Sequence, residues 1–284
     1  MSNSTFASFL FSVDLEDVRD HAKNGASFAS RVVQNTQVYL SFLRENTSKC
    51  TFFVVGNVLR NYPELIQNIL EDGHEIACHT NEHIPLDKLE QDGFRRDLDA
   101  WQISAKALGI DSVKGFRAPT FSLTEQTSWA YSILKEYGFE YSSSVLPAQN
   151  PLYGWKEFGE TPKRMNGILE IPMNLSKIGP FQIPYGGGVY FRLLPQSIIL
   201  NLFQRTKNKG IPTLGYFHPY DLDIHQERFM HGGIGDNRFY NALMYVGRKS
   251  VIPKLTSIVT EGFEISRYDA YSRALNALLE KQND

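Results

Sequence analysis

Residues 51–83 read TFFVVGNVLRNYPELIQNILEDGHEIACHTNEH. Within this stretch, Thr51–Val55 is a short run of β-branched and aromatic residues, which predicts a buried strand. Pro63–Glu71 has apolar residues at helical spacing behind a proline that favours a helix start. Glu75–Cys78 predicts a second strand, which ends directly before His79. The stretch therefore predicts a strand–helix–strand unit with parallel strands.

The same alternation continues in both directions along the chain. Strands are expected at Phe9–Val13, Val113–Phe116, Phe139–Ser143, Pro212–Phe217 and Phe263–Ser266, and helices near Phe28–Glu45, Asp87–Leu108, Glu125–Tyr137, Gln196–Lys207 and Pro253–Thr260. About seven βα units without a GxGxxG or P-loop pattern predict an α/β fold, a distorted (β/α)7-type barrel with loop-rich insertions. We expect one domain over residues 1–284 with an insertion at about 147–195, in which Ile168–Pro172 and Val189–Arg192 are short extended candidates.

Composition narrows the class of protein. The chain of 284 residues has 42% hydrophobic residues, 21% charged residues and a formal net charge of −2, so no basic field favours nucleic acid. No run approaches the ~20 apolar residues that cross a bilayer, and the N-terminus lacks the pattern of a signal peptide. We therefore expect a cytoplasmic protein without stable membrane insertion. Two cysteines are too few for a disulfide framework, and the sequence sets no oligomeric state.

Four polar residues directly follow predicted strands: Asp14, His79, Arg117 and His218. In a βα barrel the catalytic residues gather at the carboxyl ends of the strands, so these side chains are expected to lie close together.

Two of these strand ends carry groups that suit a metal ion. His79 and His83 are four residues apart, and one helical turn would bring both imidazoles to one ion. Residues 14–17 hold three carboxylates in four positions, which repel one another unless a cation or a shared proton compensates them. By itself each pattern also fits a solvated surface turn.

Read together with further segments, these residues resemble the ordered motif set of the polysaccharide deacetylase family, the NodB-homology or carbohydrate esterase family 4-like group. The segments that carry the resemblance are VDLED at 13–17, HTNEH at 79–83, GFRAPT at 115–120 and YFHPY at 216–220. PYGGGVYFRLLP at 184–195 is similar to a stretch of the cytoplasmic subgroup that acts in exopolysaccharide and O-antigen biosynthesis.

The resemblance implies a role for each residue. Asp14 would be the general base, oriented by Arg117, and His218 the general acid. The metal ligands would be Asp17, His79 and His83, with Glu16 as a rival for Asp17 because extra residues separate the two acidic positions in this form of the motif. The oxyanion and substrate-binding candidates are Thr120 through its N–H, Pro119 and Tyr220.

The function implied is metal-dependent hydrolysis of an N-acetyl group from an N-acetylated sugar, nucleotide-linked, lipid-linked or oligomeric, in surface polysaccharide biosynthesis. Zinc is the expected ion, and cobalt, nickel or iron also suit mixed oxygen and nitrogen ligands. One alternative on the same fold is hydrolysis of a small non-sugar amide or cyclic amide. An alternative of another class is a catalytically silent glycan-binding module, which the presence of every catalytic candidate disfavours.

Overall fold

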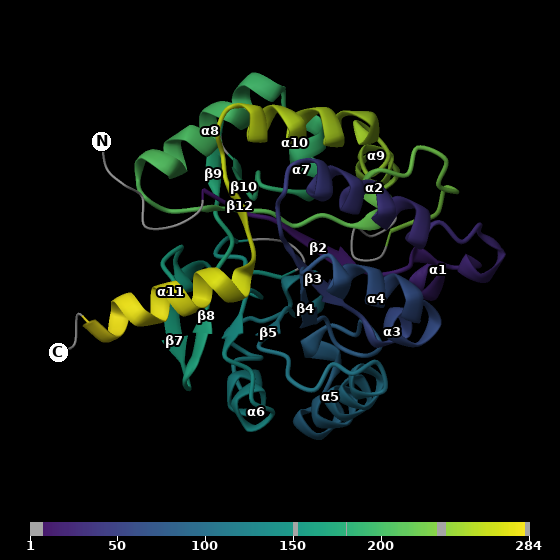
Figure 1. Ribbon diagram of the computed structural model, residues 1–284, viewed down its shortest axis with the longest axis vertical. Coiled ribbons are helices and arrows are strands. Elements are labelled where there is room, and N and C mark those ends of the chain that lie inside the picture. Colours follow the sequence, from purple (N-terminus) through teal and green to yellow (C-terminus); the bar gives the residue numbers. More distant parts are fainter. Residues whose placement is uncertain (1–7, 150–152, 180, 232–236, 282–284) are drawn as a thin grey trace.

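The computed structural model describes residues 8–149, 153–179, 181–231 and 237–281 of the chain (Figure 1). Its largest sheet has the order β2–β3–β4–β5–β6–β8–β7, in which all neighbours pair in parallel except the antiparallel edge strand β7. The strands are β2 (Ser12–Leu15), β3 (Thr51–Val54), β4 (Glu75–Cys78), β5 (Gly115–Phe116), β6 (Tyr141–Ser142), β7 (Lys163–Met165) and β8 (Ile168–Glu170).

A second parallel sheet continues the first and curves the structure into a barrel. In it β1 (Phe9–Leu10) lies between β11 (Thr213–Leu214) and β12 (Ile265–Ser266). Only Phe11 separates β1 from β2, so one nearly continuous strand belongs to both sheets. The pairing of Val13 with Phe217 joins the two sheets further. On the far side the side chain of Asn174 accepts a hydrogen bond of 2.6 Å from the Leu214 N–H. The predicted distorted α/β barrel is confirmed.

Helices cover the outside of the barrel. Figure 1 shows α2, α8 and α10 on one side of the strands and α5 and α6 on the other. The bounds are α1 (Val18–His21), α2 (Val32–Glu45), α3 (Gly56–Asn61), α4 (Pro63–Glu71), α5 (Gln91–Lys106), α6 (Ala130–Glu136), α7 (Gly188–Leu193), α8 (Gln196–Asn208), α9 (Arg238–Leu243), α10 (Val251–Thr260) and α11 (Tyr268–Lys281). Helix α4 shows why the pattern works, since Pro63 starts it and Leu65, Ile66 and Ile69 are its buried face. No helix of the described residues is long and apolar enough to cross a bilayer.

Helix α11 closes the amino-terminal end of the barrel. The Tyr268 N–H donates to Thr51 Oγ1 at 2.8 Å, and the Asp269 N–H donates to Glu75 Oε2 at 3.0 Å. The ring of Tyr268 stacks on Tyr141 inside the barrel, with 6.2 Å between ring centroids. Helix α11 therefore covers the end of the barrel at which β3 and β4 begin.

The region 147–195 is more ordered than the sequence predicts. Its Ile168–Glu170 segment becomes strand β8 of the main sheet, and β9 (Ser176–Ile178) with β10 (Phe181–Ile183) forms a hairpin. The predicted extended segment Val189–Arg192 is wrong, because these residues form helix α7. The preceding glycines explain this: a Cβ at Gly187 would overlap the Tyr216 carbonyl, and Gly188 has φ 55°, so the chain packs on the barrel and then turns into a helix.

Candidate active site

The carboxyl ends of four strand paths bring the predicted catalytic residues together. Asp14 is in β2, His79 follows β4, Arg117 follows β5, and His218 follows the segment after β11. Asp14, His79 and Arg117 are buried, and His218 is partly buried. The Asp14 N–H donates to the Phe217 carbonyl at 2.7 Å, which holds two of these strand ends side by side.

Asp14 and Arg117 form a buried ion pair. Nη1 of Arg117 lies 2.6 Å from Oδ1 of Asp14 and also donates to Ser12 Oγ at 2.7 Å. The guanidinium is held from behind by the Ser143 carbonyl at 3.0 Å and lies over the Phe53 ring, 3.9 Å from its centroid. Because Arg117 takes Oδ1, the second oxygen of Asp14 faces the site, 4.0 Å from Nε2 of His218.

His79 is held as a neutral imidazole. Its Nδ1 lies 2.8 Å from the Arg117 carbonyl, and that acceptor requires the proton on Nδ1. Burial lowers the pKa of His79 to about 4, which leaves Nε2 as a lone-pair donor at neutral pH. Metal-binding histidines are usually oriented by such a hydrogen bond through their other nitrogen.

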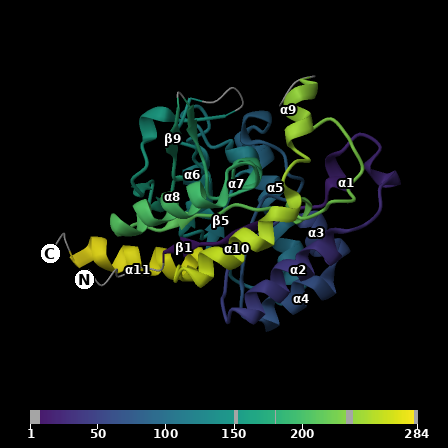
Figure 2. The same ribbon diagram turned by 90° about the horizontal axis from the view of Figure 1, so that it is seen from above.

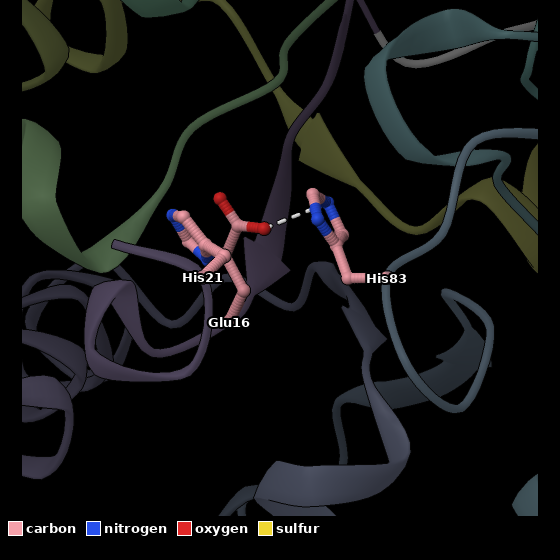
Figure 3. Close-up of side chains that lie close together, drawn as sticks. All are labelled: Glu16, His21 and His83. Atoms are coloured by element: carbon pink, nitrogen blue, oxygen red, sulfur yellow. Dashed lines mark ion pairs between the residues drawn. The ribbon is translucent and has the colours of Figure 1, made fainter. Parts of the chain in front are cut away.

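Glu16, His21 and His83 form a group that suits a cation (Figure 3). Their ligand atoms lie within 4.8 Å of one another. Oε2 of Glu16 is buried without a hydrogen-bond partner of normal geometry, although Nε2 of His83 lies 2.7 Å away. Burial favours the uncharged form of both groups, but their mutual attraction lowers the pKa of Glu16 and raises that of His83. A carboxylate and an imidazole this close, with a lone pair left over, fit a shared metal ion.

Both carboxylate oxygens of Asp17 already accept hydrogen bonds from other residues. Its carboxylate caps helix α1 by accepting from the Arg19 N–H at 3.0 Å, and it accepts from the Tyr62 hydroxyl at 2.8 Å. Of the two acidic candidates, it is Glu16 that lies beside His83. His79 is next to His83 as well, with 5.0 Å between the ring centroids.

Two residues of the site were not predicted from the sequence. His21 ends the single turn of α1, and its position five residues after Glu16 carries no motif. Asp221 is buried, and its Oδ2 lies 3.2 Å from Nδ1 of His218. The same oxygen accepts a hydrogen bond of 2.8 Å from the His218 backbone N–H. The pattern His-Pro-x-Asp is a capping box, a signal from which this pair can be found.

Asp221 determines the charge of His218. Burial alone would lower the pKa of His218, but the hydrogen bond and charge of Asp221 outweigh it and raise the pKa to about 9. Asp221 itself stays ionised because Nε of the buried Arg192 lies 3.0 Å from its Oδ1, which lowers its pKa despite burial. Nε2 of His218 then points toward Asp14 and Glu16, 4.0 and 3.9 Å away.

The remaining predicted residues are Thr120, Pro119 and Tyr220. Thr120 is exposed and has φ 54°, in the turn that Pro119 begins. The Tyr220 ring stacks on His218, with 4.6 Å between centroids.

Part of the chain is similar to known deacetylases. The family described as polysaccharide deacetylase matches residues 24–142, which include His79, His83 and Arg117, and a domain of unknown function, DUF3473, matches residues 143–273. Chitin deacetylase 1 of Saccharomyces cerevisiae is 32% identical over 127 residues, which are 44% of this chain and 40% of that protein. The peptidoglycan-N-acetylglucosamine deacetylase of Bacillus cereus is 29% identical over 96 residues, 34% of this chain and 35% of that protein. The chain thus matches less than half the length of either relative.

Solved structures share the fold over nearly the whole chain. A polysaccharide deacetylase homologue from Mycobacterium smegmatis superposes with a TM-score of 0.62 at 18% identity, covering 98% of this chain and 93% of that one. Puue allantoinase reaches 0.61 at 14% identity, covering 98% and 92%. At these identities the likeness concerns the fold alone. Residues 24–142 are therefore similar to the polysaccharide deacetylase family, and nearly the whole chain has the fold of these solved structures.

Proposed function

We propose that this protein is a metal-dependent hydrolase that removes the N-acetyl group from an N-acetylated sugar. The observation that carries the proposal is the pairing of two sets of groups at one barrel end. The first set is Glu16 and His83, a carboxylate and an imidazole that suit a cation. The second set, the buried Asp14 and the protonated His218, lies beside it. Amide hydrolysis needs a base and an acid on either side of one carbonyl, and this arrangement supplies both.

The ligand set that the proposal assigns is Glu16, His79 and His83. Glu16 takes the acidic position in place of Asp17, whose oxygens already accept from Arg19 and Tyr62. Such mixed oxygen and nitrogen ligands suit zinc, with cobalt, nickel or iron as alternatives. An ion held there would lower the pKa of a water and polarise the amide carbonyl.

The protein groups then handle the protons. Asp14, fixed through Oδ1 by Arg117, takes the proton of the attacking water on Oδ2. As the C–N bond breaks, His218 gives its proton to the departing amine, so the products are acetate and an amino sugar. In the proposed mechanism the N–H of Thr120 donates to the developing charge on the carbonyl oxygen, and Pro119 and Tyr220 contact the sugar.

The relatives support a sugar as substrate, and we propose surface polysaccharide biosynthesis as the setting, on a nucleotide-linked or lipid-linked N-acetyl sugar. The cytoplasmic location expected from the sequence stays a prediction. A silent glycan-binding module would lack part of the site, whereas every group named above is present.

Acetate release tests the proposal. The protein is stripped with a chelator, divided, and assayed with and without Zn²⁺ or Co²⁺ against UDP-N-acetyl sugars, N-acetylglucosamine oligomers and, as a cyclic amide, allantoin. Metal-dependent release of acetate with an equal amount of free amine supports the proposal. Turnover of allantoin alone, or acetate release that metal does not change, contradicts it.

The ligand set has its own test in the two flanking histidines. His79 is buried and oriented, whereas His21 is exposed on a one-turn helix. His79→Ala should therefore weaken Zn²⁺ binding, measured by competitive calorimetry, far more than His21→Ala. The reverse order would assign the third ligand to His21.

A further inference from the structure

The chain around helix α9 is held firmly on its inner side. Residues 228–231 and 237–250 are joined by hydrogen bonds of 3.0 Å from the His231 N–H to Asn241 Oδ1 and of 2.9 Å from the Phe229 N–H to the Tyr245 hydroxyl. Arg192 ties this unit to the barrel by donating to the carbonyls of Met244 and Val246, each at 2.9 Å. Residues 228–231 and 237–250 therefore form one unit that is fixed to the barrel through Arg192.

The inner side of the unit adjoins the candidate active site. The rings of Phe229 and His231 pack together with 4.3 Å between centroids, and His231 lies 6.0 Å from Tyr220, which stacks on His218. The ring of Phe229 also packs edge-on against that of His21, with 6.4 Å between the ring centroids. In Figure 2, α9 stands out on the side of the molecule where α1 lies.

The outer side is apolar and exposed. Of the aromatic residues whose exposure the structure describes, only Phe239 and Tyr240 are exposed, at 70% and 57%, and they are neighbours on α9. Met230 and Val246 add exposed aliphatic surface at 41% and 48%. Soluble proteins seldom expose large side chains in such a group without a partner.

Exposed cations belong to the same two chain segments as these apolar side chains. Arg228, Arg238 and Lys249 are exposed, and residues 228–231 and 237–250 contain no Asp or Glu, although the chain as a whole has a formal net charge of −2. We call Arg228, Met230, Arg238, Phe239, Tyr240, Val246 and Lys249 together the α9 face.

We propose that the α9 face docks on a bilayer surface that contains anionic phospholipid. Interfacial binding needs apolar side chains that enter the headgroup region and cations beside them, and the α9 face has both. A second copy of this chain is disfavoured, because a symmetric pairing would bring like charges together. A glycan stacks on aromatic rings and makes no use of Met230, Val246 or three cations. Because the inner side of this unit adjoins the candidate active site, docking through the α9 face brings the site close to the membrane. The proposed enzyme can then reach a lipid-linked sugar.

Vesicle co-sedimentation of the full chain tests the proposal, and it needs no catalytic activity. The protein should sediment with vesicles of phosphatidylcholine and phosphatidylglycerol in equal amounts, less so at high salt, and not with phosphatidylcholine alone. Phe239→Ser/Tyr240→Ser should abolish binding. Arg238→Glu/Lys249→Glu should lower the partition coefficient by at least about fivefold per charge.

Matched controls lie on the opposite helices. Ile103 on α5 is 70% exposed, as Phe239 is, so Ile103→Ser should leave binding unchanged. Lys106→Glu/Lys135→Glu alters the net charge as much as the α9 pair does, at exposed positions of α5 and α6, and should reduce binding much less. The proposal is overturned if the protein does not sediment with anionic vesicles, if the α9 variants bind like the wild type, or if controls and α9 variants lose binding equally. It is also overturned if ultracentrifugation shows a dimer that Phe239→Ser/Tyr240→Ser dissociates, or if the variants lose retention on soluble glycan instead.

Discussion

The charge of His218 should depend on Asp221, and this dependence can be measured without a substrate. The wild-type His218 has a pKa raised from 6.5 to about 9, mainly by the hydrogen bond and charge of Asp221 against the effect of burial. Asp221→Asn keeps the shape and removes the charge, so the pKa should fall to about 6.5 or below. At pH 8 the protonated fraction would drop from about nine-tenths to about 3%, a loss of about thirtyfold, but at pH 6 the loss would be less than about twofold.

Histidine-selective NMR of the metal-free protein follows this titration directly, and the alkaline limb of the rate of acetate release should shift to lower pH in parallel. Asp223→Asn is the matched control, because Asp223 is also buried but pairs with Arg31 at 2.7 Å and not with His218. A wild-type His218 that titrates below about pH 7, or a titration that Asp221→Asn leaves in place, would refute the reasoning.

Three further predictions concern other carboxylates of the barrel. Glu16→Gln should weaken Zn²⁺ binding in calorimetry by more than about 100-fold, which exceeds the loss typical of a residue that only contacts a metal ligand. Asp17→Asn still caps α1 and should leave Zn²⁺ binding nearly unchanged. Asp14→Asn should lower turnover by about 10²–10⁴ while the protein still binds its metal, as elemental analysis would show; unchanged turnover would exclude Asp14 as the base. Burial raises the pKa of Glu75 from 4.5 to about 7, so its contribution to stability is present below 4.5 and is lost as pH rises through about 7. The free energy of unfolding should therefore fall between pH 5 and pH 8, and this fall should be smaller in Glu75→Gln.

The sequence predicts those parts of the fold that local patterns determine. Strand β4 and helix α4 have the predicted bounds, because the apolar run Ile76–Cys78 and the proline start of the helix leave little alternative. The same holds for the convergence of Asp14, His79, Arg117 and His218. Asp14 lies in the last half of β2 and the others follow strand segments, and parallel strands end at one edge of a barrel.

Features that depend on distant partners are not readable in this way. Helix α11 owes its position to Thr51 and Glu75, more than 190 residues away. Val189–Arg192 is helical because the glycines before it pack on Tyr216. Glu16 rather than Asp17 pairs with His83, and the oxygens of Asp17 are taken up by Tyr62 and the α1 cap, contacts that the local sequence does not reveal. When a side chain can pair either with a neighbour in the sequence or with a distant residue, the local sequence does not tell which partner it takes.

The most direct test of the proposed metal centre is anomalous diffraction from crystals soaked in Co²⁺. A single ion is expected at roughly 2.0–2.2 Å from a Glu16 oxygen and from Nε2 of both His79 and His83, with Asp14 and His218 on either side of its open face. An ion bound by Asp17, an ion elsewhere in the molecule, or no ion at saturating Co²⁺ would contradict the assignment.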